Sequence, residues 1–209
     1  MALPGVTPFP AEFAARYRAS GYWEDRPLIA HFLDVFGAYA DRVAVMDETG
    51  SYTYAELAAL SRRVALNLLD LGVAPRDRVI VQLANTRLFA SFYFALQRIG
   101  AIPIMALPSH RYRELRQFTA LSGAVAAAAP ATARDADFGE LHRRVSAEHP
   151  QLRLSILQGE RPPGAADGSV SLEELHERRP ARHTAADLDA IGASIDPCDP
   201  AVFQLSGGT

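Results

Sequence analysis

The sequence predicts an α/β protein: a parallel-rich sheet flanked by helices, with a helical lead-in at the N-terminus. Two observations carry this prediction. Short apolar runs alternate with amphipathic segments of helical length, and the runs are continuously apolar instead of alternating with polar residues. Continuous runs indicate strands buried on both faces, as in parallel sheets covered by helices on two sides. We therefore divide the chain into a helical segment, residues 1–42, and an α/β portion, residues 43–209.

The lead-in is expected to hold two helices. Phe9, Phe13 and Tyr17 recur at intervals of four residues, and Ile29 to Phe36 repeat the helical spacing after a proline. The aromatic side chains are interpreted as core residues.

A different pattern begins at residue 43. Residues 43–46 and 51–53 favour two short strands, and a helix should follow directly. Thr53 and Glu56 have the spacing of a capping box, in which hydroxyl and carboxylate accept from free amides of the first turn. Gly72 is placed as the left-handed residue that ends this helix.

The rest of the α/β portion follows the alternating pattern. Asn85, Ser109 and Asp137 are expected as N-caps, and residues 180–200 look mixed and turn-rich. Strands are predicted at 79–83, 102–106, 125–129, 152–157 and 201–205, and helices at 86–99, 110–121 and 138–148, with a short one capped by Ser171 and Glu174.

Composition and charge argue against several classes of function. The net charge is −3, so the chain lacks the positive field on which nonspecific nucleic-acid binding depends. No apolar run approaches the roughly 20 residues of a membrane span, and the first residues do not resemble a signal peptide. A single cysteine, Cys198, fits a reducing, cytoplasmic compartment. All 21 Lys+Arg residues are arginine, so no lysine chemistry is open to this chain.

The most informative feature is the last tetrapeptide. Ser206, Gly207, Gly208 and Thr209 directly follow an expected buried strand. Glycines without side chains let phosphate oxygens approach consecutive backbone amides, and the two hydroxyl groups add donors. Such a tetrapeptide taken alone is usually an ordinary turn. Its position favours a phosphate-binding role, because ligands of open α/β sheets bind at the carboxyl ends of the strands.

The other candidate groups are better explained without a ligand. The six histidines show no metal-ligand spacing and are expected as scattered surface or capping residues, so no metal site is predicted. Arg111, Arg113 and Arg116 favour solvated surface over an anion or partner patch. Cys198 has no basic neighbour in the sequence and is taken as structural or incidental. Ser206 lacks the preceding glycine of a nucleophile elbow.

Three segments, in order, resemble the core motifs of the adenylate-forming superfamily of acyl-CoA ligases, luciferases and nonribosomal adenylation domains. Residues 51–57 (Ser-Tyr-Thr-Tyr-Ala-Glu-Leu) are similar to the first motif and residues 96–103 (Leu-Gln-Arg-Ile-Gly-Ala-Ile-Pro) to the second. Residues 203–209 resemble the opening of the third, the phosphate-binding loop. The resemblance implies that Ser206 to Thr209 bind phosphates of ATP, which is used together with Mg²⁺.

Finer features resemble one branch, the stand-alone aryl acid ligases that activate 2,3-dihydroxybenzoate or salicylate for siderophore assembly. These features are residues 10–17, 21–23 and 106–111 and the Ser-Gly-Gly-Thr form of the loop. The resemblance implies condensation of an aryl carboxylate with MgATP to an aryl adenylate and pyrophosphate. The acyl group would then pass to the phosphopantetheine thiol of an aryl carrier protein. The choice between the two acids stays open.

The chain departs from this family by stopping inside the loop, which normally continues with Thr, Gly and then Pro-Lys. We interpret it as an N-terminal fragment without the acid pocket, the C-terminal domain or any catalytic residue, and expect it to be inactive by itself. Two alternatives remain: a CoA ligase of the same superfamily, and a noncatalytic nucleotide-binding or interaction module.

Overall fold

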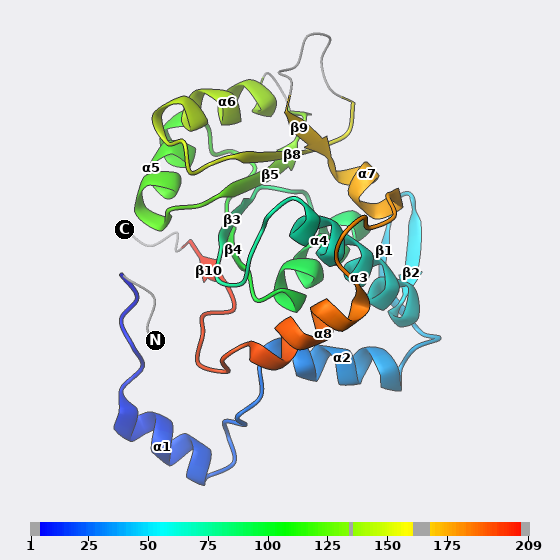
Figure 1. The fold of residues 1–209 in the computed structure, drawn as a ribbon, viewed down its shortest axis with the longest axis vertical. Helices are drawn as coiled ribbons and strands as arrows, with labels where there is room; N and C mark the ends of the chain where they lie inside the picture. The colour runs from blue at the N-terminus through cyan, green and yellow to red at the C-terminus, as the bar shows by residue number, and fades with distance from the viewer. Residues whose placement is uncertain (1–4, 134–135, 161–167, 206–209) are drawn as a thin grey trace.

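The computed structural model describes residues 5–133, 136–160 and 168–205, and it confirms the predicted α/β architecture (Figure 1). Its centre is a six-stranded sheet of order β10-β4-β3-β5-β8-β9, in which every neighbouring pair is parallel. The strands are β3 (Arg78–Val81), β4 (Ile102–Met105), β5 (Ala126–Pro130), β8 (Leu154–Gln158), β9 (Ser169–Ser171) and β10 (Phe203–Gln204).

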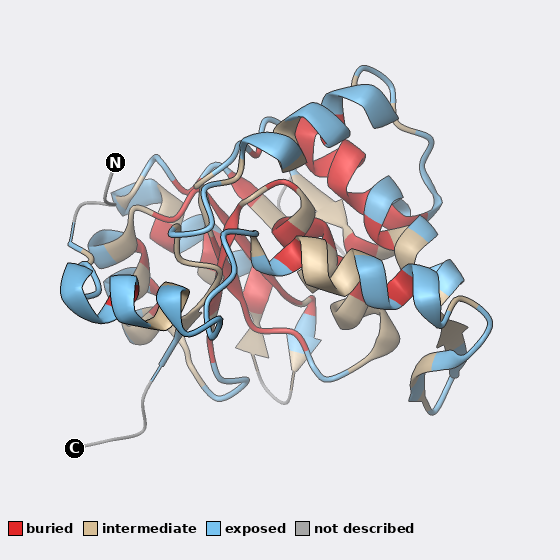
Figure 2. Ribbon diagram, turned by 90° about the horizontal axis from the view of Figure 1, so that it is seen from below, coloured by how far each residue is buried: buried red, intermediate tan, exposed pale blue. Residues whose placement is uncertain are grey.

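Helices cover both faces of the sheet (Figures 1 and 2). Successive side chains of the central strands pack alternately in two cores, one on each face. Val79 and Val81 of β3 pack in one core, and Ile80 between them packs in the other. The first core is closed by α3 (Tyr54–Asp70), α4 (Arg87–Arg98), α7 (Leu172–Glu177) and α8 (Ala185–Ser194), and the second by α5 (Tyr112–Ser122) and α6 (Phe138–Glu148).

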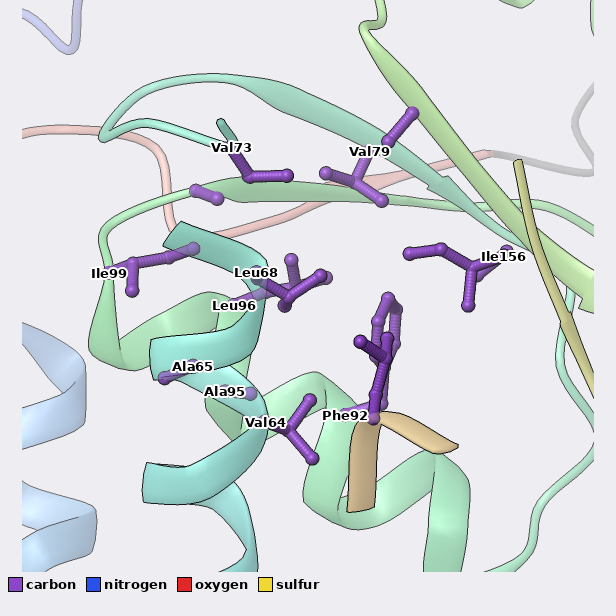
Figure 3. Packing of buried hydrophobic residues seen from close by; sticks show 14 of the residues in the cluster. Val64, Ala65, Leu68, Val73, Val79, Phe92, Ala95, Leu96, Ile99 and Ile156 are labelled. Carbon is purple, nitrogen blue, oxygen red and sulfur yellow. The ribbon is translucent and has the colours of Figure 1, made fainter. Parts of the chain in front are cut away.

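The larger core lies between α3, α4 and the sheet (Figure 3). Leu68 of α3 and Phe92 and Leu96 of α4 are fully buried there, against Val79 and Ile156 of the strands. Removing a buried leucine side chain from such a core costs about 2–5 kcal/mol, because the cavity does not close completely. This packing fixes α4 against β3 and β4.

Strand β5 is built almost entirely from alanine, which does not favour strands by itself. Ala126 to Ala129 are nevertheless buried, and the strand pairs with both β3 and β8. Tertiary burial and two hydrogen-bonded ladders therefore outweigh the weak local propensity, and the strand predicted at 125–129 is confirmed.

Most helix ends follow the predicted local chemistry. Thr53 and Glu56 form the capping box of α3, Asp137 caps α6, and Gly72 after α3 has a φ of 83°. Two predicted caps are wrong: Thr86, not Asn85, accepts from the first turn of α4, and α5 begins after Arg111 and not after Ser109. In both cases a neighbouring residue with suitable geometry takes the position.

The segment predicted as turn-rich contains an unpredicted helix, α8. Its capping box joins Thr184 and Asp187, and Leu188 is the one residue of this helix that is buried. The apolar stripe is short and lies among alanines, so the helical period is weak in the sequence. The strand β9 and a small hairpin of β6 (Thr132–Ala133) with β7 (Ala136–Asp137) were also not predicted.

The N-terminal part contains the two predicted helices, α1 (Ala11–Ala19) and α2 (Leu28–Ala38), and then an antiparallel hairpin of β1 (Val43–Asp47) and β2 (Gly50–Thr53). Helix α1 stands apart from the sheet (Figure 1). Ile29 and Phe36 of α2 are buried as expected, but Phe9 is 52% exposed and packs on Trp23 at the surface. Phe13 of α1 is exposed as well, so the interpretation of all lead-in aromatics as core residues is wrong for Phe9 and Phe13.

Candidate functional site at the carboxyl edge of the sheet

The carboxyl ends of all six strands lie along one edge of the sheet, because the strands are parallel. Strand β10 reaches this edge beside β4, with Phe203 opposite Ile104 and Gln204 opposite Met105. The predicted phosphate-binding residues Ser206, Gly207, Gly208 and Thr209 come next in the chain, and they lie outside the described residues. Their role stays a prediction.

The helices that follow the adjacent strands β3 and β4 lie on opposite faces of the sheet. Helix α4, after β3, packs in the first core, whereas α5, after β4, packs in the second. The connections that follow β3 and β4 therefore leave toward opposite faces of the sheet. In open α/β sheets, ligands bind in the crevice where neighbouring connections part in this way.

Residues 107–110, which follow β4, are called the 107–110 loop. Side chains hold this loop by hydrogen bonds to its backbone. The Gln82 Nε2 donates to the carbonyl oxygens of Leu107, at 2.7 Å, and His110, at 3.2 Å. The Leu107 amide donates to Nδ1 of His110 at 3.1 Å. Arg111 Nη1 donates to the carbonyl oxygens of Pro108, at 2.8 Å, and His110, at 2.9 Å. The loop is thus fixed from both sides.

The N-terminus of α4, near the same edge, already has an anionic partner. The Arg87 amide donates to the Asp47 carboxylate at 3.0 Å, and Arg87 Nη2 donates to the Thr49 carbonyl at 3.0 Å. The amide of Arg87 and the hydroxyl of Thr49 lower the pKa of Asp47 to about 2. This helix end therefore binds the β1–β2 hairpin and is not open to a phosphate.

A sizeable cavity lies away from this edge of the sheet. A volume of about 670 Å³ opens between the N-terminal segment and residues 196–200, which precede β10 and so lie on its amino side. The arginines around it are paired, Arg18 with Asp25 at 2.8 Å and Arg26 with Asp34 at 2.7 Å. Both arginine side chains that line this cavity are therefore engaged by carboxylates.

The histidines differ in part from the surface scatter that the sequence suggested. His142 and His176 are buried. His142 Nδ1 lies 2.7 Å from Ser155 Oγ, and His176 Nε2 lies 2.5 Å from Ser91 Oγ. Burial lowers the pKa of both, to about 4 for His142. Within residues 5–133, 136–160 and 168–205, no three His, Cys, Asp or Glu side chains are grouped to hold a metal ion.

The remaining candidates have structural partners. Arg116 pairs with Glu148 at 2.6 Å, while Arg111 serves the 107–110 loop. Cys198 is exposed, and its Sγ lies 3.2 Å from Arg18 Nη2, a basic neighbour that the local sequence does not show. The expectation that this thiol has no basic neighbour is therefore wrong.

The profile of the AMP-binding enzyme family matches residues 33–209, which is most of the chain. The chain belongs to this family. It is 40% identical over 212 residues to a salicyl-AMP ligase / salicyl-S-ArCP synthetase of Mycobacterium tuberculosis, covering 99% of this chain and 35% of that protein. It is 35% identical to a 2,3-dihydroxybenzoate-AMP ligase of Bacillus subtilis, covering 99% of this chain and 36% of that protein.

The fold agrees with the same group of proteins. The apo structure of Mycobacterium smegmatis MbtA superposes with a TM-score of 0.81 at 39% identity, over 98% of this chain and 36% of that one. The resemblance to aryl acid AMP ligases, predicted from the motifs, is confirmed. The chain spans about a third of the length of these relatives. The helices of its described part are all too short or too polar to cross a bilayer.

Sequence reasoning missed the contacts of Gln82, which joins the end of β3 to the 107–110 loop. A signal was present, because Gln82 is the one polar residue within the apolar run at residues 79–83. A buried amide must find hydrogen-bond partners. The partners, however, lie 25 and 28 residues further along the chain, and no local pattern shows them.

Proposed function

We propose that the protein containing this chain activates an aryl acid, salicylate or 2,3-dihydroxybenzoate, with ATP. The observation that carries the proposal is the 40% identity to a salicyl-AMP ligase over 99% of the chain. In support of the proposal, Ser206 follows one residue after strand β10, which ends at the carboxyl edge. A nucleotide bound there would meet the residues predicted to hold its phosphates.

The proposed reaction needs stabilisation of a departing anion. A carboxylate oxygen of the acid attacks the α-phosphorus of ATP, and the bond from that phosphorus to the bridging oxygen breaks. The products are an aryl adenylate and pyrophosphate. The amides of Gly207 and Gly208 and the hydroxyls of Ser206 and Thr209 would donate to the β- and γ-phosphates, where charge accumulates.

Mg²⁺ is assigned to the substrate and not to a resident site. No cluster of three or more metal-ligating side chains occurs in the described ranges, so none of these residues is proposed as a ligand. Magnesium bound to ATP neutralises phosphate charge and polarises the phosphoryl oxygens.

A second step would consume the adenylate. The phosphopantetheine thiol of an aryl carrier protein would attack the acyl carbon, forming a thioester and releasing AMP, in the cytoplasm and in the service of siderophore assembly. An alternative acceptor has support of its own: a Streptomyces salicylyl-CoA synthase / salicylate adenylyltransferase is 37% identical over the whole chain. Free CoA and carrier protein, offered separately to the enzyme charged with adenylate, distinguish the two.

The direct test is exchange of labelled pyrophosphate into ATP by the full-length protein. We expect exchange that depends on salicylate or 2,3-dihydroxybenzoate. Thr209→Ala should lower the exchange rate about a hundredfold, the size of losing one preorganised donor. Thr132→Ala, at an exposed threonine of β6, is the matched control and should leave the rate unchanged. Absence of exchange with every hydroxybenzoate would contradict the proposal.

A further inference from the structure

Three features lie at the ends of adjacent strands along the carboxyl edge of the sheet. Strands β10, β4 and β3 are neighbours in this order, and they lead to Ser206, to the 107–110 loop and to Gln82 respectively. Neighbouring strands lie about 4.8 Å apart. A triphosphate bound at the end of β10 would therefore lie within side-chain reach of the 107–110 loop.

Gln82 holds that loop from inside the protein. Its side chain is 1% exposed, and its Nε2 donates to two loop carbonyls, those of Leu107 and His110. Its Oε1 is buried and accepts no hydrogen bond from the described residues. The backbone amide of Gln82 also donates to the Ala128 carbonyl at 2.8 Å, which anchors the residue to β5. Gln82 thus joins three strand ends, with its side chain bonded to the loop after β4 and its backbone to β5.

The loop is exposed to solvent and is nevertheless tightly held. Leu107 is 57% exposed, and Pro108 and Ser109 are exposed as well. Arg111 holds the loop from outside, and its own amide donates to Glu114 at 2.9 Å. Exposed loop tips ordinarily move freely, so the bonds to the backbone keep a surface of defined shape on one side of the crevice.

We propose that Gln82 is a positioning residue for adenylation, which rests on the proposed function above. By tying the 107–110 loop to the end of β3, it keeps the wall of the nucleotide crevice in the geometry that the transition state needs. Misplacement of groups by about 1 Å costs up to a hundredfold in rate even when the chemistry is untouched. Loss of Gln82 should therefore lower turnover more than it lowers substrate affinity.

The chain offers a matched control in a second buried glutamine. Gln97 is 5% exposed, and its Nε2 donates to the Ala201 carbonyl at 2.6 Å. Ala201 precedes β10, so this bond lies on the amino side of the strand and away from the crevice. Gln82→Met and Gln97→Met each remove one buried amide and keep the side-chain length, and only the first touches the loop.

The experiment measures pyrophosphate exchange and backbone hydrogen exchange in the full-length protein. We expect Gln82→Met to lower kcat about tenfold, with the KM for the aryl acid changed by less than about twofold. Amides of residues 106–111 should exchange faster in this variant. Gln97→Met should keep the kcat of the wild type and leave amide exchange in the loop unchanged. Arg111→Gln, at the surface, loosens the loop from the other side and should act in the same direction if Gln82→Met fails to fold.

The outcomes separate this inference from the proposed function. A wild-type protein without aryl-acid-dependent exchange overturns both. An active wild type whose kcat is unchanged in both Gln82→Met and Arg111→Gln overturns only the positioning role. Equal losses in Gln82→Met and Gln97→Met would show a general effect of core damage and would also overturn it.

Discussion

Asp70 and Gln82 are both buried polar residues whose side chains bond to the backbone of a distant segment. Asp70 precedes β3 in the chain, and Gln82 directly follows it. Asp70, at the end of α3, accepts from the backbone amides of Ala181, Arg182 and His183. Gln82, just after β3, donates to two carbonyls of the 107–110 loop. Asp70 is a charged acceptor far from the crevice, whereas Gln82 is a neutral donor beside it.

Because the two side chains hold different parts of the fold, we expect loss of Asp70 and loss of Gln82 to change different properties of the protein. Asp70 fixes the segment that leads into α8, which closes the first core, so its loss should appear in stability. Gln82 fixes an exposed loop, so its loss should appear in turnover. Both side chains bond to the backbone of a distant segment, so the position of that segment in the fold decides the consequence.

The largest expected effect on stability comes from Asp70→Ala. The substitution leaves the backbone amides of residues 181–183 without their buried carboxylate acceptor, and hydrogen bonds to a charged group are the stronger kind. We expect the free energy of unfolding to fall by about 3 kcal/mol, measured by urea titration. Hydrogen exchange of α8 should rise in the same variant. A change as small as that of a surface substitution would contradict the anchoring role.

Acid should distinguish the two anchors. Burial raises the pKa of Asp70, but the amide of Ala181 and the ring of His183 outweigh it, and the net pKa lies well below its usual value. The stability that Asp70 contributes is therefore present above about pH 4 and lost as the pH falls further. The Gln82 amide does not titrate. Amide exchange of residues 181–183 should accelerate below this pH before exchange of the 107–110 loop does.

A smaller loss is expected at milder acidity from the buried histidines. Burial lowers the pKa of His142 to about 4 and also lowers the pKa of His176. Unfolded histidine takes up a proton near pH 6.5, so stability is full above that pH and declines as the pH falls below it, by up to about 1.4 kcal/mol for His142 over the first pH unit. His142→Asn should flatten the unfolding free energy in this window. An unchanged slope would contradict the assignment.

The smallest effect is expected at Arg116, whose ion pair with Glu148 is exposed on both sides. Exposed pairs contribute little, because solvent and salt screen them. Arg116→Ala should leave the urea midpoint unchanged within experimental error and leave pyrophosphate exchange at the wild-type rate. A large loss in either would show that this patch does more than face solvent.

The sequence analysis predicted the parts of the fold that carry local signals. The strands at residues 79–83 and 102–106 and the capping box of Thr53 and Glu56 are in place because apolar period and capping act over a few residues. Helix α8 was missed although Thr184 and Asp187 have capping spacing, since its apolar stripe is too short to outweigh the turn-forming residues around it.

The sequence could predict candidate site residues only where they are contiguous in the chain. Ser206 to Thr209 stand after a recognisable strand, so a local motif could single them out, and their role stays a prediction. The contacts of Gln82 and Asp70 join residues 25 to 113 positions apart. Such contacts arise from the order of strands in the sheet, and one sequence does not show which buried polar residue will meet which loop.

The most direct test of the nucleotide-binding edge is a crystal structure of the full-length protein with a nonhydrolysable ATP analogue. We predict that the triphosphate lies at the carboxyl ends of β10 and β4, against residues 206–209 and beside the 107–110 loop. A nucleotide bound instead in the cavity between the N-terminal segment and residues 196–200, with the carboxyl edge empty, would contradict the account.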